Sequence, residues 1–129
     1  MRAHAHDAGW DLAIPHDEEL QAGERRRIDL LIRVAIPRGH AGLILPRSSM
    51  SAEGIDCALG VIDAGYTGTI SVILINRTRN TALLSASQRV AQLVVTSIST
   101  MALAAGTVDR DTARGNDGFG SSGKWWGEL

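Results

Sequence analysis

Residues 60–75 read GVIDAGYTGTISVILI, a stretch in which two apolar segments flank a turn that contains glycine. From Thr69 to Val72 polar and apolar side chains alternate, as expected of a strand with one buried face. Asp63 and Gly65 stand in the turn, where both residue types are common. The stretch therefore predicts a β-hairpin.

The same kind of segment recurs on both sides of this hairpin. Strand-length runs rich in Val, Ile, Leu and Thr lie at 27–36, 41–45, 69–75 and 89–98, with glycine or proline between them. The one plausible helix is short, from Ser48 to Glu53, and Gly54 ends it. With 129 residues, the chain is long enough for a single core. We expect one all-β domain.

The C-terminal segment differs in composition from the rest of the chain. From about Gly106 the apolar periodicity stops, and Gly, Ser and Asp dominate. Phe119, Trp125 and Trp126 add large apolar side chains to this polar segment. We expect residues 1–105 to form a β-core and residues 106–129 a flexible arm that closes over a ligand or a neighbouring subunit.

Composition narrows the class of ligand. The single cysteine, Cys57, excludes an intrachain disulfide and fits a reducing compartment. The apolar runs are far below the roughly 20 residues that cross a bilayer. A net charge of -1 argues against a broad nucleic-acid surface, but every basic residue except Lys124 is arginine, which grips phosphate with two hydrogen bonds. We expect a cytoplasmic protein with a small phosphorylated ligand, and neither nucleic acid nor membrane as a partner.

Two short motifs each have a functional and a structural interpretation. Residues 46–49, read PRSS, place an arginine and two hydroxyls at a strand-to-helix junction, where free backbone N–H groups favour an anion. The alternative is a capping serine beside a surface arginine. Asp63 and Tyr66 surround a glycine turn and could form a pocket, or Asp63 is simply a turn former. The run from Arg25 to Arg27 predicts a solvated strand entry.

Residues 114–124 form a glycine-rich run with two serines and flanking cations, able to wrap backbone N–H groups around phosphates. Residues 118–124 also match the phosphate-loop pattern. That interpretation fails because Trp125 replaces the Ser or Thr that would hold Mg²⁺, and too few residues follow for a helix.

Read together, these segments resemble the five motifs of the trimeric dUTPase family, in the family's order and spacing. The resemblance covers the chain from Ala8 to Gly123, and five motifs in order very rarely arise by chance. The matching segments are 8–12 (AGWDL), 47–49 (RSS) with Gly54, 60–68 (GVIDAGYTG), 89–93 (RVAQL), and 114–123 (RGNDGFGSSG).

The resemblance implies a jelly-roll-like subunit and a homotrimer whose active sites lie between subunits, with the fifth motif contributed by a neighbouring chain. It implies hydrolysis of dUTP to dUMP and pyrophosphate with Mg²⁺, which limits uracil incorporation into DNA and supplies dUMP for dTMP synthesis. Asp63 would orient and deprotonate the water that attacks the α-phosphorus, and would meet the deoxyribose 3′-hydroxyl. Tyr66 would lie under the sugar and exclude a ribose.

The resemblance also assigns substrate contacts position by position. Donors to the triphosphate and its surroundings would be Arg47, Ser48, Ser49, Gln92, Arg114, Gly120, Ser121 and Ser122. Phe119 would stack on uracil, and Asp11 would reach Mg²⁺ through a water. The uracil edge would be read by hairpin residues between Cys57 and Ser71, chiefly Gly60, Val61 and Ile62.

Some positions depart from the family pattern. Cys57 stands where some members carry a uracil-binding Asn, and other members use backbone alone there. Thr69 stands where an acidic residue is frequent. Ser87 and Gln88 replace the usual Gly-Asp before Arg89.

Two alternative functions remain. A dCTP deaminase shares the fold and the Arg-Ser-Ser segment but needs a glutamate on the strand after the hairpin, and residues 70–76 (ISVILIN) carry no carboxylate. A regulatory protein that binds a nucleotide on the same fold is the second alternative. Such a protein could lose Asp63 or Arg114, and both are present.

Overall fold

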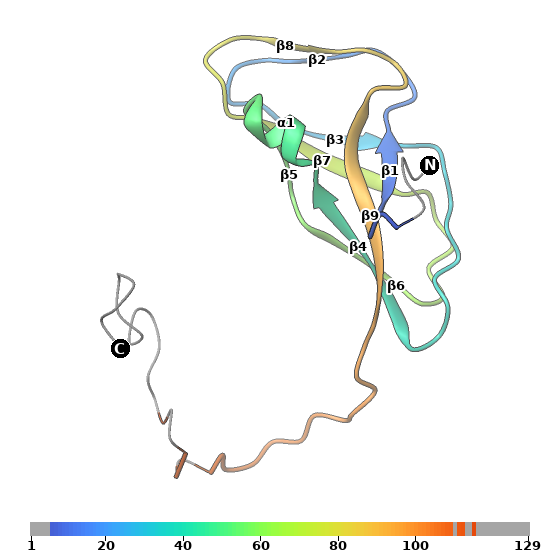
Figure 1. The fold of residues 1–129 in the computed structure, drawn as a ribbon, viewed down its shortest axis with the longest axis vertical. Coiled ribbons are helices and arrows are strands. Elements are labelled where there is room, and N and C mark those ends of the chain that lie inside the picture. The colour runs from blue at the N-terminus through green and yellow to red at the C-terminus, as the bar shows by residue number, and fades with distance from the viewer. Residues whose placement is uncertain (1–5, 110, 113–114, 116–129) are drawn as a thin grey trace.

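The computed structural model describes residues 6–109, 111–112 and 115. These residues form an all-β, jelly-roll-like sandwich with a short helix, which confirms the predicted fold class (Figure 1). The elements are β1 (Trp10–Ala13), β2 (Glu18–Leu20), β3 (Arg25–Asp29), β4 (His40–Pro46), α1 (Ser48–Ala52), β5 (Ile55–Cys57), β6 (Gly60–Asp63), β7 (Ser71–Asn76), β8 (Ala82–Leu84) and β9 (Arg89–Ser97).

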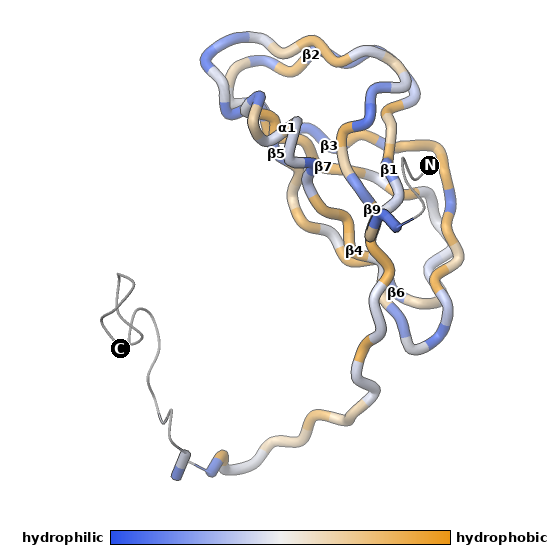
Figure 2. The backbone as a smooth tube through the Cα atoms, viewed as in Figure 1, coloured by the Kyte–Doolittle hydropathy of each residue, from blue (hydrophilic) through white to orange (hydrophobic). Residues whose placement is uncertain are grey.

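The strands form three antiparallel sheets. The largest has the order β1-β9-β4-β6, the second β3-β7-β5, and β2 pairs with β8 alone. Inward-facing side chains from these strands make one continuous core, with Leu20, Val72, Leu74 and Val90 almost fully buried. Figure 2 shows hydrophobic residues along β4, β7 and β9, whereas the loop between β7 and β8 is hydrophilic.

The predicted strand at 27–36 is too long. β3 ends at Asp29, and its pairing with β7 stops at Ser71. Leu31 has a positive φ of 58°, which a continuous strand does not allow. Its N–H donates to Asp29 Oδ1 at 2.8 Å, so the chain turns out of the ladder at this point.

The predicted hairpin at 60–75 is split. Its turn is present, because Tyr66 N–H donates to the Asp63 carbonyl at 3.1 Å and Gly65 has a φ of 94°. Its two arms do not pair with each other, however, because β6 pairs with β4 whereas β7 pairs with β3 and β5. The arms thus belong to different sheets and leave a gap between them.

After β9, residues 98–109 form neither helix nor strand and lead away from the sandwich (Figure 1). Met101 and Leu103 are 82% and 101% exposed. The boundary at residue 105 between core and arm stays a prediction. Within the described ranges, no helix is long and apolar enough to cross a membrane.

Candidate functional site

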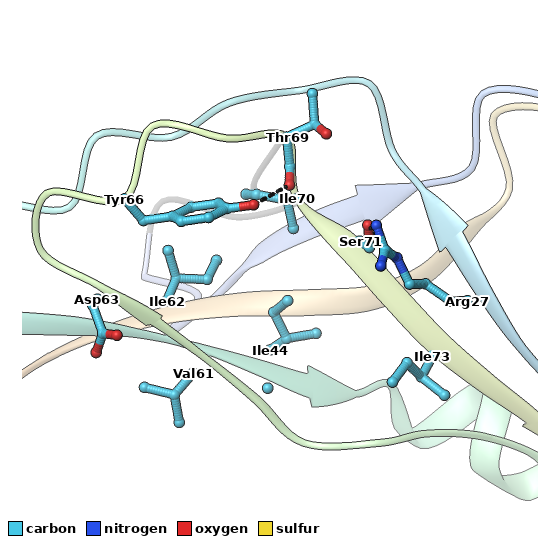
Figure 3. Close-up of a pocket in the computed structure, with 11 residues that line it drawn as sticks. Arg27, Ile44, Val61, Ile62, Asp63, Tyr66, Thr69, Ile70, Ser71 and Ile73 are labelled. Carbon is cyan, nitrogen blue, oxygen red and sulfur yellow. Dashed lines mark hydrogen bonds between the residues drawn. The ribbon is translucent and has the colours of Figure 1, made fainter.

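The gap between β6 and β7 holds a pocket of about 370 Å³, which we call the hairpin pocket (Figure 3). It gathers six residues that the sequence predicted to meet substrate, together with apolar side chains from both sheets. Its lining is Arg27, Ile44, Gly60, Val61, Ile62, Asp63, Tyr66, Thr69, Ile70, Ser71 and Ile73. The volume lies within the range of about 300–1,000 Å³ typical of small-molecule sites.

Backbone groups of β7 face this pocket. The Ile73 carbonyl points toward the β5 side, because it accepts the Ala58 N–H at 2.9 Å. Along a strand, the N–H and C=O of one residue share an edge, and alternate residues use the same edge. Ser71, two residues before Ile73, therefore presents its N–H and C=O to the pocket, one donor beside one acceptor.

A chain of hydrogen bonds holds Tyr66. Its hydroxyl donates to the Thr69 carbonyl at 2.9 Å, and the Thr69 hydroxyl donates to Asp29 Oδ2 at 2.7 Å. The bonds from Thr69 and from the Leu31 N–H lower the pKa of Asp29. Gly68 leaves space for the phenol, because an added Cβ there would stand 2.6 Å from Tyr66 Cζ. The tyrosine is half exposed yet fixed in direction.

A second, polar pocket of about 180 Å³ lies where β4 meets α1, and we call it the junction pocket. Its lining is Asp7, Asp11, Arg47, Ser48, Ser49 and Gln92. Arg47 is the N-cap residue of α1, and no side-chain capping bond forms there among the described residues. The structure therefore does not support the alternative interpretation, in which a serine caps this helix.

Asp11 organises the junction pocket. Its Oδ1 lies 2.9 Å from Arg47 Nε, and its Oδ2 lies 2.9 Å from Arg89 Nη1. Arg47 Nη1 also donates to the Arg89 carbonyl at 3.0 Å, and Gln92 Nε2 donates to the Pro46 carbonyl at 3.0 Å. Strand register explains the gathering, since Gln92 is the partner of both Asp11 in β1 and Leu45 in β4.

Asp63 of the hairpin pocket and Arg47 of the junction pocket lie toward opposite ends of β4. Asp63 pairs with Ala41 near the start of that strand, whereas Arg47 directly follows its last residue, Pro46. Six residues of extended chain span roughly 20 Å. One chain therefore does not bring the carboxylate of Asp63 to the guanidinium of Arg47.

Other predicted residues fall outside both pockets or outside the described residues. The Cys57 side chain is buried, its thiol donates to the Ala58 carbonyl, and burial raises its pKa, so it faces the core. The predictions for Arg114, Phe119, Gly120, Ser121 and Ser122 concern residues that the structure does not describe.

The described residues contain no group of three or more His, Cys, Asp or Glu side chains that could hold a metal ion. The carboxylate of Asp11, in the junction pocket, is the group expected to reach Mg²⁺ through a water. An arginine lies against each of its two oxygens. This arrangement fits a hydrated ion reached through a water, and does not fit direct ligation by several carboxylates.

Two arginines of these sites, Arg27 and Arg89, were not among the predicted substrate contacts. Arg27 was interpreted as solvated, but it stands opposite Ile73 in the β3–β7 ladder and lines the hairpin pocket. The available signal was alternation, because Arg25 and Arg27 lie on the outer face of β3 and Ile28 on the buried face. Arg89 was read only as part of a motif, and no sequence signal pointed to its ion pair with Asp11.

Comparisons with known proteins identify the family of this chain. The family model for dUTPase matches residues 1–123. The chain is similar to a deoxyuridine 5'-triphosphate nucleotidohydrolase of Cutibacterium acnes, with 41% identity over 91% of this chain and 80% of that protein. It is also similar to the solved Staphylococcus bacteriophage 80alpha dUTPase with dUPNHPP, with a TM-score of 0.89 and 28% identity over 96% and 90% of the two chains.

A third similarity concerns a metal. A mutant dUTPase from phage phi11 of S. aureus, whose structure describes the coordination of a structural Mg(II) ion, has a TM-score of 0.79 with 25% identity. The similarity covers 84% of this chain and 89% of that one.

Proposed function

The chain belongs to the dUTPase family, and on that premise we propose that it hydrolyses dUTP to dUMP and pyrophosphate at sites shared between the subunits of a homotrimer. The observation that carries the proposal is the pair of pockets. One has the size and edge chemistry for a nucleoside, and the other has the charge for phosphates. Within one chain, roughly 20 Å of extended strand separates Asp63 of the first pocket from Arg47 of the second.

The hairpin pocket takes the deoxyuridine. Uracil offers two carbonyl oxygens and an N–H between them, and the N–H and C=O of Ser71 match one acceptor and one donor of that edge. Tyr66, fixed by Thr69, packs against the sugar and leaves no room for a 2′-hydroxyl. Asp63 is exposed at the turn, where it meets the 3′-hydroxyl and takes a proton from the attacking water.

The junction pocket takes the phosphates. Arg47 is aimed by Asp11, and Ser48, Ser49 and Gln92 add neutral donors around it. Donors placed in this way stabilise the charge that grows on pyrophosphate as it leaves. The fifth motif, with Arg114, Gly120, Ser121 and Ser122, supplies further phosphate contacts, and Phe119 covers the uracil.

Sharing between subunits follows from the substrate's own geometry. The 3′-hydroxyl and the 5′-phosphate sit on the same sugar ring, only a few bonds apart. A substrate whose sugar meets Asp63 cannot also place its phosphates on the Arg47 of the same chain. In a symmetric ring of subunits, each hairpin pocket can face the junction pocket of a neighbour, which brings Asp63 of one subunit close to Arg47 of another.

Mg²⁺ would be held mainly by the triphosphate oxygens, with Asp11 contacting its hydration shell, and would supply positive charge to the leaving pyrophosphate. The protein residues orient and ionise the reactants. Asp63 acts on the water, whereas Arg47 and Gln92 position the phosphates. We place the enzyme in the cytoplasm, where it limits uracil in DNA and supplies dUMP for dTMP synthesis.

The two alternatives find less support. β7 presents no carboxylate for deamination along Ser71–Asn76. A purely regulatory nucleotide-binding protein has no use for the exposed carboxylate of Asp63 beside the nucleoside pocket.

Pyrophosphate release from dUTP with Mg²⁺ tests the proposal, with dCTP, dTTP and UTP as competing substrates. We expect rapid release from dUTP, little from the others, and a trimeric mass by light scattering. A truncation before Arg114 should keep the trimer and nearly abolish hydrolysis. Tight dUTP binding without pyrophosphate release would favour the regulatory alternative, and a monomeric mass with full activity would remove the shared site.

A further inference from the structure

Arg27 is the one side chain in the hairpin pocket that carries a positive charge. It extends from β3, the strand next to β7, and its Nε donates to Ser71 Oγ at 3.3 Å. Figure 3 shows Arg27 and Ser71 together at the end of the pocket away from Asp63. The side chain is exposed, and within the described part of the chain it forms no ion pair.

The position of Arg27 fits the base end of the pocket. If Asp63 and Tyr66 hold the sugar, the base extends from C1′ along β7 toward Ser71 and Ile73. Ser71 faces this space with its backbone N–H and C=O, and Arg27 adds a guanidinium beside the same residue. A guanidinium has five N–H donors and no acceptor, and the bond to Ser71 uses only one donor.

A side chain that can only donate hydrogen bonds distinguishes uracil from cytosine. Uracil carries a carbonyl oxygen at position 4, which accepts a hydrogen bond. Cytosine carries an amino group there, which only donates. An arginine at that position therefore attracts a 4-keto base and opposes a 4-amino base, and a charge-assisted bond in a sheltered pocket discriminates strongly.

We propose that Arg27 is a specificity-determining residue of the base subsite, which donates to the 4-keto oxygen of the pyrimidine and so selects against cytosine. The inference rests on the proposed function and adds a side-chain contact to recognition by the hairpin backbone. It assigns Arg27 no part in the chemical step.

The test compares Arg27→Leu with Arg25→Leu in otherwise unchanged trimers. Arg25 lies on the same outer face of the same strand but does not line the pocket, so its loss changes the net charge equally. We expect Arg27→Leu to lower kcat/KM for dUTP about ten-fold or more, mainly through KM, and to leave the much slower dCTP reaction unchanged or faster. The ratio of dUTP to dCTP use should fall, whereas Arg25→Leu should behave as wild type.

Equilibrium binding provides a second readout that does not depend on turnover. Non-hydrolysable dUTP and dCTP analogues should differ less in affinity for Arg27→Leu than for the wild-type protein. Equal losses for both nucleotides would show that Arg27 attracts the shared triphosphate, and no loss for either nucleotide would show that it only lines the pocket. Either result would overturn the proposal, whereas a wild-type protein that does not hydrolyse dUTP would instead overturn the proposed function.

Discussion

The hairpin pocket and the junction pocket are built by opposite means. The first arises where two chain segments part into different sheets, so backbone groups of β7 join the side chains of its lining. The second arises where three strands converge, and its polar groups are side chains held by the carboxylate of Asp11. In the function we propose, shape and hydrogen-bond edges select the base, charge binds the phosphates, and a second subunit brings the two tasks together.

The largest expected effect comes from Asp63→Asn in the hairpin pocket. The substitution keeps the size of the side chain but removes the proton acceptor, so kcat should fall by about 10² to 10⁴-fold. Affinity for a non-hydrolysable dUTP analogue should change little, because the shape of the pocket is kept. Steady-state kinetics and calorimetry measure the two quantities, and a wild-type kcat would show that the base lies elsewhere.

Arg47→Lys probes the junction pocket in the same way. Lysine keeps the positive charge but loses the planar guanidinium, which can hold a phosphate with two hydrogen bonds while its Nε lies 2.9 Å from Asp11 Oδ1. We expect kcat/KM for dUTP to fall by about 10- to 100-fold. Arg38→Lys is the matched control, since Arg38 is exposed and lines neither pocket. Equal kinetics for the two variants would remove Arg47 from the phosphate site.

Asp29 links the stability of the hairpin pocket to pH. Hydrogen bonds from Thr69 and Leu31 hold the pKa of Asp29 below its ordinary value of about 3.9. The ionised carboxylate therefore stabilises the fold above the unfolded-state pKa, and this contribution disappears as the pH falls through the lower folded-state pKa. The difference in urea midpoint between wild type and Asp29→Asn should shrink below about pH 4. A difference that is constant with pH would contradict this role.

The smallest effect concerns the turn beside Asp29. Leu31 is 62% exposed and holds a φ of 58°, a conformation that costs a residue with a side chain about 1 to 2 kcal/mol. Leu31→Gly should raise the free energy of unfolding by up to about 1 kcal/mol without changing activity. Leu83→Gly, at an exposed position within β8, should instead lower it by about 0.5 to 1 kcal/mol. Urea denaturation would show whether the signs are opposite.

The two pockets also differ in how far the sequence predicted them. The resemblance to the family predicted Asp11, Arg47, Ser48, Ser49 and Gln92 as site residues position by position, and all five line the junction pocket. The division of the hairpin between two sheets was not predicted. Strand pairing depends on contacts between distant segments, and alternation within 60–75 gives no information about which partners β6 and β7 choose.

Short strands and unusual turns account for most of the remaining differences. β2, β5 and β8 have three residues each, too few for a periodic signal. The early end of β3 depends on a leucine with positive φ, a conformation that residue type alone would not suggest. The long strands β4, β7 and β9, rich in Val, Ile and Leu, were predicted to within two residues at each end.

Mixed trimers test the central claim, that one active site combines the hairpin pocket of one subunit with the junction pocket of another. Asp63→Asn and Arg47→Leu subunits, each nearly inactive alone, would be co-expressed with different tags, and trimers that carry both tags would be purified. Each trimer that carries both tags has one site of three that pairs an intact hairpin pocket with an intact junction pocket, so we expect about a third of wild-type activity. Activity that stays at the level of the separate variants would show that both pockets act within one chain.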